Sequence, residues 1–159
     1  MRNVFSDALH YVRHHGRPAA HSPADSAAED HFTQWVVGDL ASHTHAVDAL
    51  VADNTRWLDR SAQALRQGLD DAVVEQHVLA GALAMAKTQL SVSRIALQAA
   101  ERLFETGGAS ATSRQHNFDR HWRNLRTIFN HNPLMQKARV IGDHHLNGTT
   151  RHLEEGKVF

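Results

Sequence analysis

Residues 36–64 read VVGDLASHTHAVDALVADNTRWLDRSAQA. Apolar and small side chains recur in this stretch at alternating spacings of three and four, which is typical of a helix that packs along its length against other helices. The members of this stripe are Val36, Leu40, His43, Val47, Leu50, Asn54, Trp57, Ser61 and Ala64. Upstream, Asp25-Ser26 offers an N-cap, and Glu29 stands three residues after Ser26 as in a capping box. The pattern therefore predicts a helix over residues 27–67.

Helical spacing continues on either side of this stretch. Residues 3–15 predict a short helix that stops at Gly16-Arg17-Pro18, and residues 69–105 predict a well-buried, alanine-rich helix in which Gly81 permits close approach of a neighbour. A fourth helix begins near residue 117, and Pro133 separates it from a fifth helix that ends near residue 147. We predict an all-α fold: an up-and-down four-helix bundle with a short additional helix, in a single domain over residues 1–159.

Composition narrows the classes of function. Lysine plus arginine equals aspartate plus glutamate at 17 each, so no net field attracts nucleic acid. The chain has no cysteine, which fits the cytoplasm and excludes thiolate chemistry. No apolar run approaches the roughly 20 residues that span a bilayer. Among 14 histidines, His10 and His14 share a helix face, but no third ligand follows at a fitting interval. We predict no metal site, no nucleic acid and no membrane.

Residues 103–149 read LFETGGASATSRQHNFDRHWRNLRTIFNHNPLMQKARVIGDHHLNGT. The order and spacing of HWRNLRT, HNP and ARVIGDHHLNG resemble the last segment of the dibenzothiophene monooxygenase and sulfur-acquisition oxidoreductase branch of the acyl-CoA dehydrogenase superfamily. The short first helix, the loop after it and the two long helices also fit this family. The resemblance implies a four-helix bundle. It also implies an N-terminal helical domain and a middle β-domain, which these 159 residues do not encode.

The resemblance suggests one catalytic residue, His131 of the HNP motif. In this branch of the family a histidine at this position is expected to act as acid or base beside the flavin, where the dehydrogenases place a glutamate nearby. Imidazole suits the task because it exchanges protons near neutral pH. Without the resemblance, His131 is an ordinary helix-terminal histidine before a proline.

The glycine pair at the end of the third helix is the candidate cofactor loop. Gly107 and Gly108 end the helix, the amides of Ala109 and Ser110 are expected to point at a phosphate, and Ser110 and Arg114 add donors. The resemblance implies contact with the flavin, FMN or FAD, of a neighbouring subunit. The alternative is a glycine C-cap between helices.

A basic stretch follows this loop and has its own interpretation. It comprises Arg114, Arg120, Arg123 and Arg126, interleaved with Phe118 and Trp122. We expect Trp122 to lie in the core, Arg123 to form a structural ion pair, and Arg120 or Arg126 to serve subunit contacts.

Three functions compete. The first is the C-terminal bundle of a flavin-dependent monooxygenase, which provides oligomer contacts and part of the flavin and substrate pocket. The second is a fragment of a true acyl-CoA dehydrogenase, against which the histidine at position 131 argues. The third is a free-standing bundle that only oligomerises or docks onto a flavin-binding partner. We expect this chain to form a dimer or tetramer, to retain no flavin alone and to be catalytically incomplete by itself.

Overall fold

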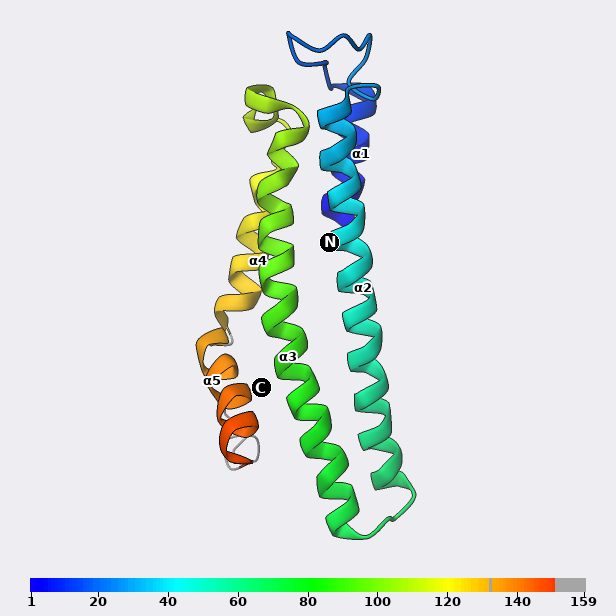
Figure 1. The fold of residues 1–159 in the computed structure, drawn as a ribbon, viewed down its shortest axis with the longest axis vertical. Coiled ribbons are helices and arrows are strands. Elements are labelled where there is room, and N and C mark those ends of the chain that lie inside the picture. The colour runs from blue at the N-terminus through cyan, green and yellow to red at the C-terminus, as the bar shows by residue number, and fades with distance from the viewer. Residues whose placement is uncertain (132, 151–159) are drawn as a thin grey trace. The chain divides into compact units, whose positions relative to one another are not determined.

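The computed structural model describes residues 1–131 and 133–150, and these residues form helices without any strand. The five α-helices are α1 (Arg2–His14), α2 (His31–Arg66), α3 (Asp71–Arg102), α4 (Asp119–His131) and α5 (Leu134–Asn147). Two short 3-10 helices, η1 (Leu103–Thr106) and η2 (Gly108–Thr112), lie between α3 and α4 (Figure 1). The all-α prediction is confirmed.

The described chain divides into two compact units, and each is described by itself. The first unit comprises Met1–Val47 and Arg94–Thr127, and so holds α1, the start of α2, the end of α3, both 3-10 helices and most of α4. The second unit comprises Asp48–Ser93 and the described residues from Ile128 onward. That all 159 residues behave as a single domain stays a prediction.

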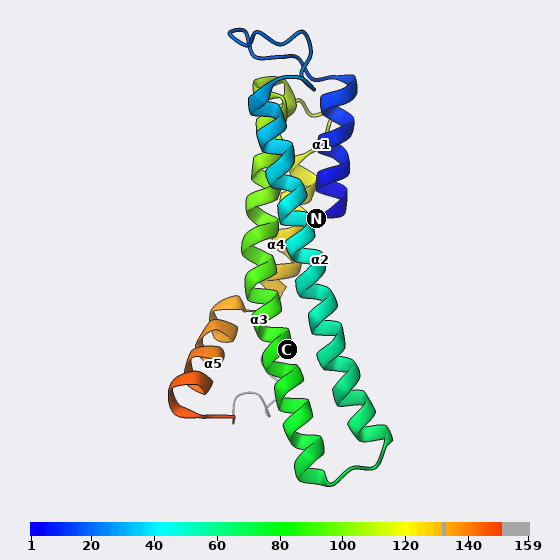
Figure 2. The ribbon, with the colours of Figure 1, turned by 45° about the vertical axis from the view of Figure 1, so that its right-hand side comes forward.

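The core of the first unit joins residues from α1, α2, α3 and the turn region before α4. α1 contributes Val4, Ala8 and Tyr11, α2 contributes Val36 and Leu40, and α3 contributes Ala99; Leu103, Ala111 and Phe118 come from the turn region before α4. Figures 1 and 2 both show α1 beside the first half of α2. At about 25 cal/mol per Å² of buried apolar surface, this core is the main stabilising term of the unit.

In the second unit, α2 and α3 run side by side in both views (Figures 1 and 2). The predicted close approach at Gly81 is confirmed, because a Cβ at this residue would lie 2.7 Å from the Ser61 Oγ. Ser61 in turn donates to the carbonyl oxygen of His77 at 2.7 Å. α5 packs Val140 against Leu79, Ala82 and Leu83 of α3.

The inward stripe of α2 is confirmed, since each of its nine predicted members is buried or half-buried. The predicted start of this helix is wrong. α2 begins at His31, and Asp30 is its N-cap, with its carboxylate accepting from the Thr33 N–H at 2.9 Å. Ser26 and Glu29 do meet, at 3.0 Å, but they stabilise the turn before the helix.

Burial along α3 also differs from the prediction of a well-buried helix. The end of α3 is buried in the first unit at Ala96, Ala99 and Ala100, whereas Val73 and Val78 in the second unit are 39% and 43% exposed. Alanines at the buried end allow neighbouring helices to approach closely, and the larger residues at the other end leave apolar surface open.

Two of the three tryptophans, Trp35 and Trp122, lie toward the helix surface, whereas Trp57 is half-buried in the inward stripe of α2. Trp35 is 62% and Trp122 45% exposed, so the prediction that Trp122 is a core residue is wrong. Each indole ring carries an arginine guanidinium: Arg102 lies 4.3 Å from Trp35, Arg60 lies 4.9 Å from Trp57, and Arg126 lies 5.4 Å from Trp122. Such stacking lets an indole stay partly solvated while its face is covered.

Candidate functional site

The turn after α3 carries the candidate cofactor residues. η1 ends at Thr106, whose hydroxyl donates to the Leu103 carbonyl at 2.7 Å, and Gly108 opens η2 with a positive φ of 53°. This conformation favours glycine. The prediction that the two glycines end the long helix is wrong, because α3 ends at Arg102 and the 3-10 helix η1 lies between it and Gly107.

Gly107 has a different reason for being glycine. Its φ of −147° suits any residue, but a Cβ at this position would lie 2.1 Å from Cε1 of the Tyr11 ring. Tyr11 is 2% exposed and packs edge-on to His116 at 4.9 Å and to Phe118 at 5.5 Å between ring centroids. Gly107 thus lets the α3 turn seat directly against α1.

A polar cavity of about 450 Å³ opens at this contact. Its lining comes from the end of α1 and from the turn before α4: Tyr11, His15, Arg17, Gly107, Ser110, Ser113, Gln115 and His116. The rings of His15 and His116 lie 5.5 Å apart across it. Among these lining residues there are hydroxyl, amide, imidazole and guanidinium groups but no carboxylate, so the cavity is suited to an anion.

Of the five predicted cofactor residues, two line this cavity: Gly107 and Ser110. Gly108, Ala109 and Arg114 are exposed residues of the same turn region and are not among its lining residues. That the Ala109 and Ser110 amides point at a phosphate stays a prediction.

Sequence reasoning missed the other half of the lining. His15, Arg17 and Tyr11 precede the turn by about ninety residues of sequence, and no local motif ties them to it. The stop of the first helix at Gly16-Arg17-Pro18 places His15 and Arg17 at a helix C-terminus, where the helix dipole favours cations, but this does not by itself indicate an anion site.

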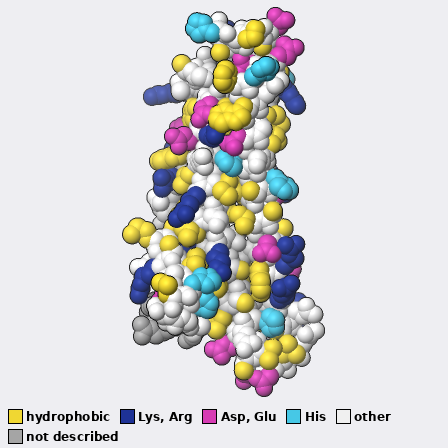
Figure 3. All heavy atoms as spheres, viewed as in Figure 1, with side chains coloured by type: hydrophobic (Ala, Val, Ile, Leu, Met, Phe, Trp, Pro, Cys, Tyr) yellow, Lys and Arg dark blue, Asp and Glu magenta, His cyan; other side chains and the backbone are white. Residues whose placement is uncertain are grey.

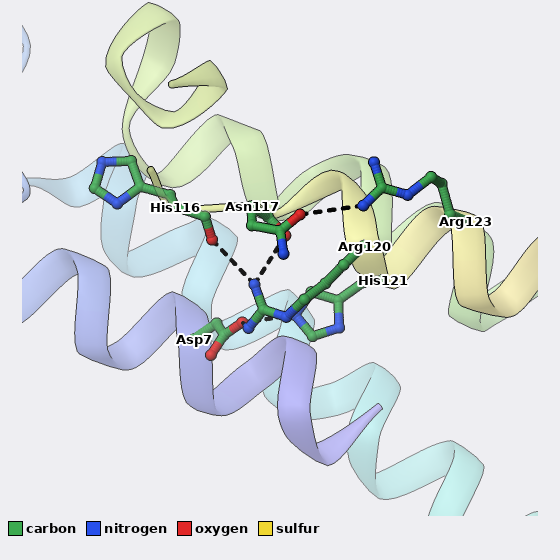
Figure 4. A network of polar contacts seen from close by, with 6 residues as sticks. All are labelled: Asp7, His116, Asn117, Arg120, His121 and Arg123. Atoms are coloured by element: carbon green, nitrogen blue, oxygen red, sulfur yellow. Dashed lines mark hydrogen bonds and ion pairs between the residues drawn. The ribbon is translucent and has the colours of Figure 1, made fainter. Parts of the chain in front are cut away.

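An ion-pair network fixes the start of α4 against α1 (Figure 4). Asp7 of α1 accepts from Arg120 and from His121 Nε2, the latter at 2.6 Å. Arg120 also donates from Nη1 to the carbonyl oxygens of His116 and Asn117, at 3.0 and 2.8 Å.

Arg120 and Arg123 both form ion pairs within the described chain. Arg120 forms the pair that joins two helices, and that Arg120 or Arg126 serves a subunit contact stays a prediction. Arg123 forms its ion pair with Asp119 one turn earlier on α4, and both side chains are 56% exposed. An exposed pair of this kind contributes little to stability.

The candidate catalytic residue lies in the second unit. His131 is the last residue of α4 and its side chain is exposed. Its role in acid–base chemistry stays a prediction.

Within residues 1–131 and 133–150, no three histidine or carboxylate side chains are arranged to hold a metal ion. In that same part of the chain, none of the helices has the length and hydropathy to cross a membrane.

Comparison with known proteins gives a consistent family. The domain described as "Acyl-CoA dehydrogenase, C-terminal domain" matches residues 2–136. The probable FMNH2-dependent monooxygenase SfnC of Pseudomonas putida is 34% identical over 150 residues, covering 91% of this chain and 35% of SfnC. Dibenzothiophene monooxygenase of Mycolicibacterium goodii is 29% identical over 148 residues, covering 92% of this chain and 34% of that enzyme.

Solved structures give the same result. FMN-bound TdsC from Paenibacillus sp. A11-2 superimposes with a TM-score of 0.79 at 28% identity, over 93% of this chain and 36% of TdsC. The methanesulfinate monooxygenase MsuC of Pseudomonas fluorescens superimposes with a TM-score of 0.79 at 29% identity, over 93% of this chain and 37% of MsuC. The chain thus spans about a third of the length of the relatives that it matches.

Proposed function

The chain belongs to the acyl-CoA dehydrogenase C-terminal domain family, and on that premise we propose that it provides the helical part of an FMN-dependent monooxygenase. In this role it supplies a cavity for the flavin phosphate, an acid–base histidine and surfaces for subunit contact. The activity belongs to the complete enzyme, and the relatives are about three times as long as this chain.

The cavity beside Gly107 is the observation that carries the proposal. A phosphate group needs several hydrogen-bond donors, at least one cation and no nearby carboxylate. Arg17, His15 and His116 supply positive or proton-donating groups, and Ser110 and Ser113 supply hydroxyls. The residues present therefore fit the phosphate of FMN, which a neighbouring subunit or a partner would present.

Reduced FMN, when bound, would supply the two electrons with which molecular oxygen is activated, so that one oxygen atom passes to the substrate and the other leaves as water. The part assigned to this chain is narrower. The cavity residues hold the phosphate end, and the imidazole of His131 accepts or returns a proton at Nε2.

The names of the relatives support FMN over FAD and a small sulfur-containing substrate. SfnC is described as FMNH2-dependent, TdsC as FMN-bound, and the other relatives as acting on dibenzothiophene or methanesulfinate. A true acyl-CoA dehydrogenase is the weaker proposal, because position 131 is a histidine.

Subunit contact is the second part of the role. Exposed apolar side chains of the second unit include Val51, Leu58, Leu65, Val73 and Val78. Figure 3 shows hydrophobic side chains open to solvent among charged ones on the face in view. We propose a dimer or tetramer of a cytoplasmic protein, and light scattering that gives only the 17.7 kDa monomer would contradict it.

Flavin binding is tested by titrating the isotope-labelled chain with FMN, riboflavin and inorganic phosphate while following amide and imidazole NMR signals. FMN and phosphate should shift the signals of the cavity residues with a dissociation constant on the order of 1 mM, while riboflavin, which lacks the phosphate, should not. Binding this weak leaves the desalted chain colourless. Equal shifts from FMN and riboflavin, or none at the cavity, would refute the phosphate assignment.

The catalytic role is tested in a chimera in which this chain replaces the matching third of SfnC. We expect FMNH2-dependent oxygenation in the chimera and a loss of about a hundredfold or more in His131→Asn. The matched control is His145→Asn, another exposed histidine of the second unit. An active His131→Asn chimera would eliminate the acid–base role. An inactive but oligomeric parent chimera would favour the non-catalytic bundle.

A further inference from the structure

We propose that Asp7 and Arg120 are a positioning pair that holds His116 in the cavity and so determines how tightly the cavity binds a phosphate group. The inference rests on the proposed phosphate-binding role of that cavity. Neither Asp7 nor Arg120 is among the residues that line the cavity, so their effect must pass through the segment that carries His116.

The contacts of Arg120 reach this segment directly (Figure 4). Nη1 donates to the carbonyl oxygens of His116 and Asn117, and Nη2 pairs with Asp7. One planar guanidinium thus spans two consecutive backbone carbonyls and a carboxylate on another helix. A lysine ammonium, which is a point charge on a flexible stem, does not reproduce this fork.

The backbone of the segment needs such support. Asn117 has a φ of 48°, a left-handed conformation that residues with a Cβ seldom adopt. Its side-chain oxygen accepts from Arg123 Nη2 at 3.1 Å, while its carbonyl is held by Arg120. The conformation at Asn117 sets the direction in which the preceding residue, His116, leaves the turn.

Asp7 anchors the fork to α1. Its carboxylate accepts from Arg120 and from His121 Nε2, and the His121 side chain is only 10% exposed. The same helix carries Tyr11, against which the His116 ring packs at 4.9 Å between centroids. α1 therefore holds His116 twice, through the ring of Tyr11 and through the Asp7–Arg120 pair.

The position of the imidazole matters because hydrogen bonds weaken steeply with distance and angle. If Arg120 is replaced by lysine, the carbonyls of His116 and Asn117 lose a shared donor and the imidazole is no longer fixed. Complete loss of one charge-assisted hydrogen bond to phosphate lowers affinity by about tenfold or more, so a partly displaced imidazole should cost about fivefold or more.

The test measures the inorganic phosphate affinity of the 159-residue chain by NMR titration in Arg120→Lys, Asp7→Asn, His116→Ala and the double variant Arg120→Lys/His116→Ala. The matched control is Arg56→Lys with Asp53→Asn, an ion pair at 3.0 Å in the second unit. We expect each of Arg120→Lys and Asp7→Asn to weaken phosphate binding by about fivefold or more, and the control pair to leave it unchanged.

A merely structural role is distinguished by the double variant. If Arg120 acts through His116, Arg120→Lys has no further effect once His116 is alanine. An equal loss in both backgrounds would overturn the inference, as would unchanged affinity in Arg120→Lys. Should Arg120→Lys fail to fold, Asp7→Asn carries the same comparison in the His116→Ala background.

Failure of the proposed function is recognised separately. If the parent chain binds no phosphate, the positioning role is still measured through the His116 imidazole signals and the amide exchange of residues 113–118. Arg120→Lys should shift those signals and speed that exchange while far-UV circular dichroism stays unchanged. Signals and exchange identical to the parent chain would refute the positioning pair whatever the phosphate result.

Discussion

Substitution of Gly107 by alanine tests the seat of the α3 turn against α1. The added Cβ would lie 2.1, 2.5 and 2.6 Å from Cε1, Cζ and Oη of Tyr11, whereas ordinary contacts begin near 3.4 Å. The ring would have to withdraw by roughly 1.3 Å, but it is 2% exposed and held between His116 and Phe118. The site therefore has little room to relax.

Overpacking a tight core costs about 1–3 kcal/mol, and the lack of room places this substitution near 3 kcal/mol. For a chain of this size that loss lowers Tm by about 6–12 °C. Backbone strain adds nothing, because the φ of −147° at Gly107 suits alanine. The matched control is Gly38→Ala in the helical part of the same unit, where no atom lies within 4 Å of the new Cβ. Its higher helix propensity should stabilise the chain by up to about 1 kcal/mol.

Urea unfolding followed by far-UV circular dichroism gives the free energies of unfolding. NMR signals of Tyr11, the single tyrosine of the chain, report the local displacement. The two glycine substitutions should change stability in opposite directions, and only Gly107→Ala should move the tyrosine signals. A Gly107→Ala chain within about 0.5 kcal/mol of the parent, with its tyrosine signals unmoved, would refute the close-approach argument.

Three further predictions concern titration and packing. Hydrogen bonds from the Ser22 hydroxyl and the Thr33 N–H lower the pKa of Asp30 in the folded chain. The stabilisation by its carboxylate is therefore complete above about pH 4 and is lost as the pH falls through the folded-state pKa. In urea unfolding experiments, the free energy of unfolding of Asp30→Asn should fall less at acidic pH than that of the parent chain. Burial lowers the pKa of Lys137, so the unfolded chain binds this proton more tightly than the folded chain does. The free energy of unfolding should therefore rise with pH up to about 10.4, the pKa of the unfolded lysine. Lys137→Met should remove this rise in unfolding experiments at alkaline pH. Gly81→Ala should lower Tm, because its Cβ meets the Ser61 Oγ at 2.7 Å. A smaller loss of Tm in the Ser61→Ala background would verify the contact, and an equal loss would contradict it.

Helix positions were predictable wherever periodicity and chain breaks agree. The inward stripe of α2 follows from its spacing alone, and Pro133 directly precedes α5 as predicted, whereas the glycine pair follows η1 and does not end α3. The start of α2 was mispredicted because two capping signals, Ser26 and Asp30, lie four residues apart. Ser26 with Glu29 matches the capping-box pattern, yet Asp30 binds the Thr33 N–H and begins the helix.

The candidate site was predictable only on the side that is local in sequence. Gly107 and Ser110 stand in one turn, whereas His15 and Arg17 reach the cavity from α1 and its following loop through tertiary packing. The arginines show the same limit. Arg120 and Arg123 are equivalent in a periodic pattern, and only the position of Asp7 on a different helix decides which of them joins two helices.

The tryptophans under their arginines have an optical consequence. Indole emission responds to the polarity around the ring, and the fluorophores Trp35 and Trp122 are half open to water. The intrinsic fluorescence of this chain therefore reports mainly on helix surfaces, and core unfolding should change it less than in a protein with buried indoles. A second chain that covers either ring would displace water and shift its emission to the blue. Association can therefore be followed by the tryptophan emission of the unlabelled protein.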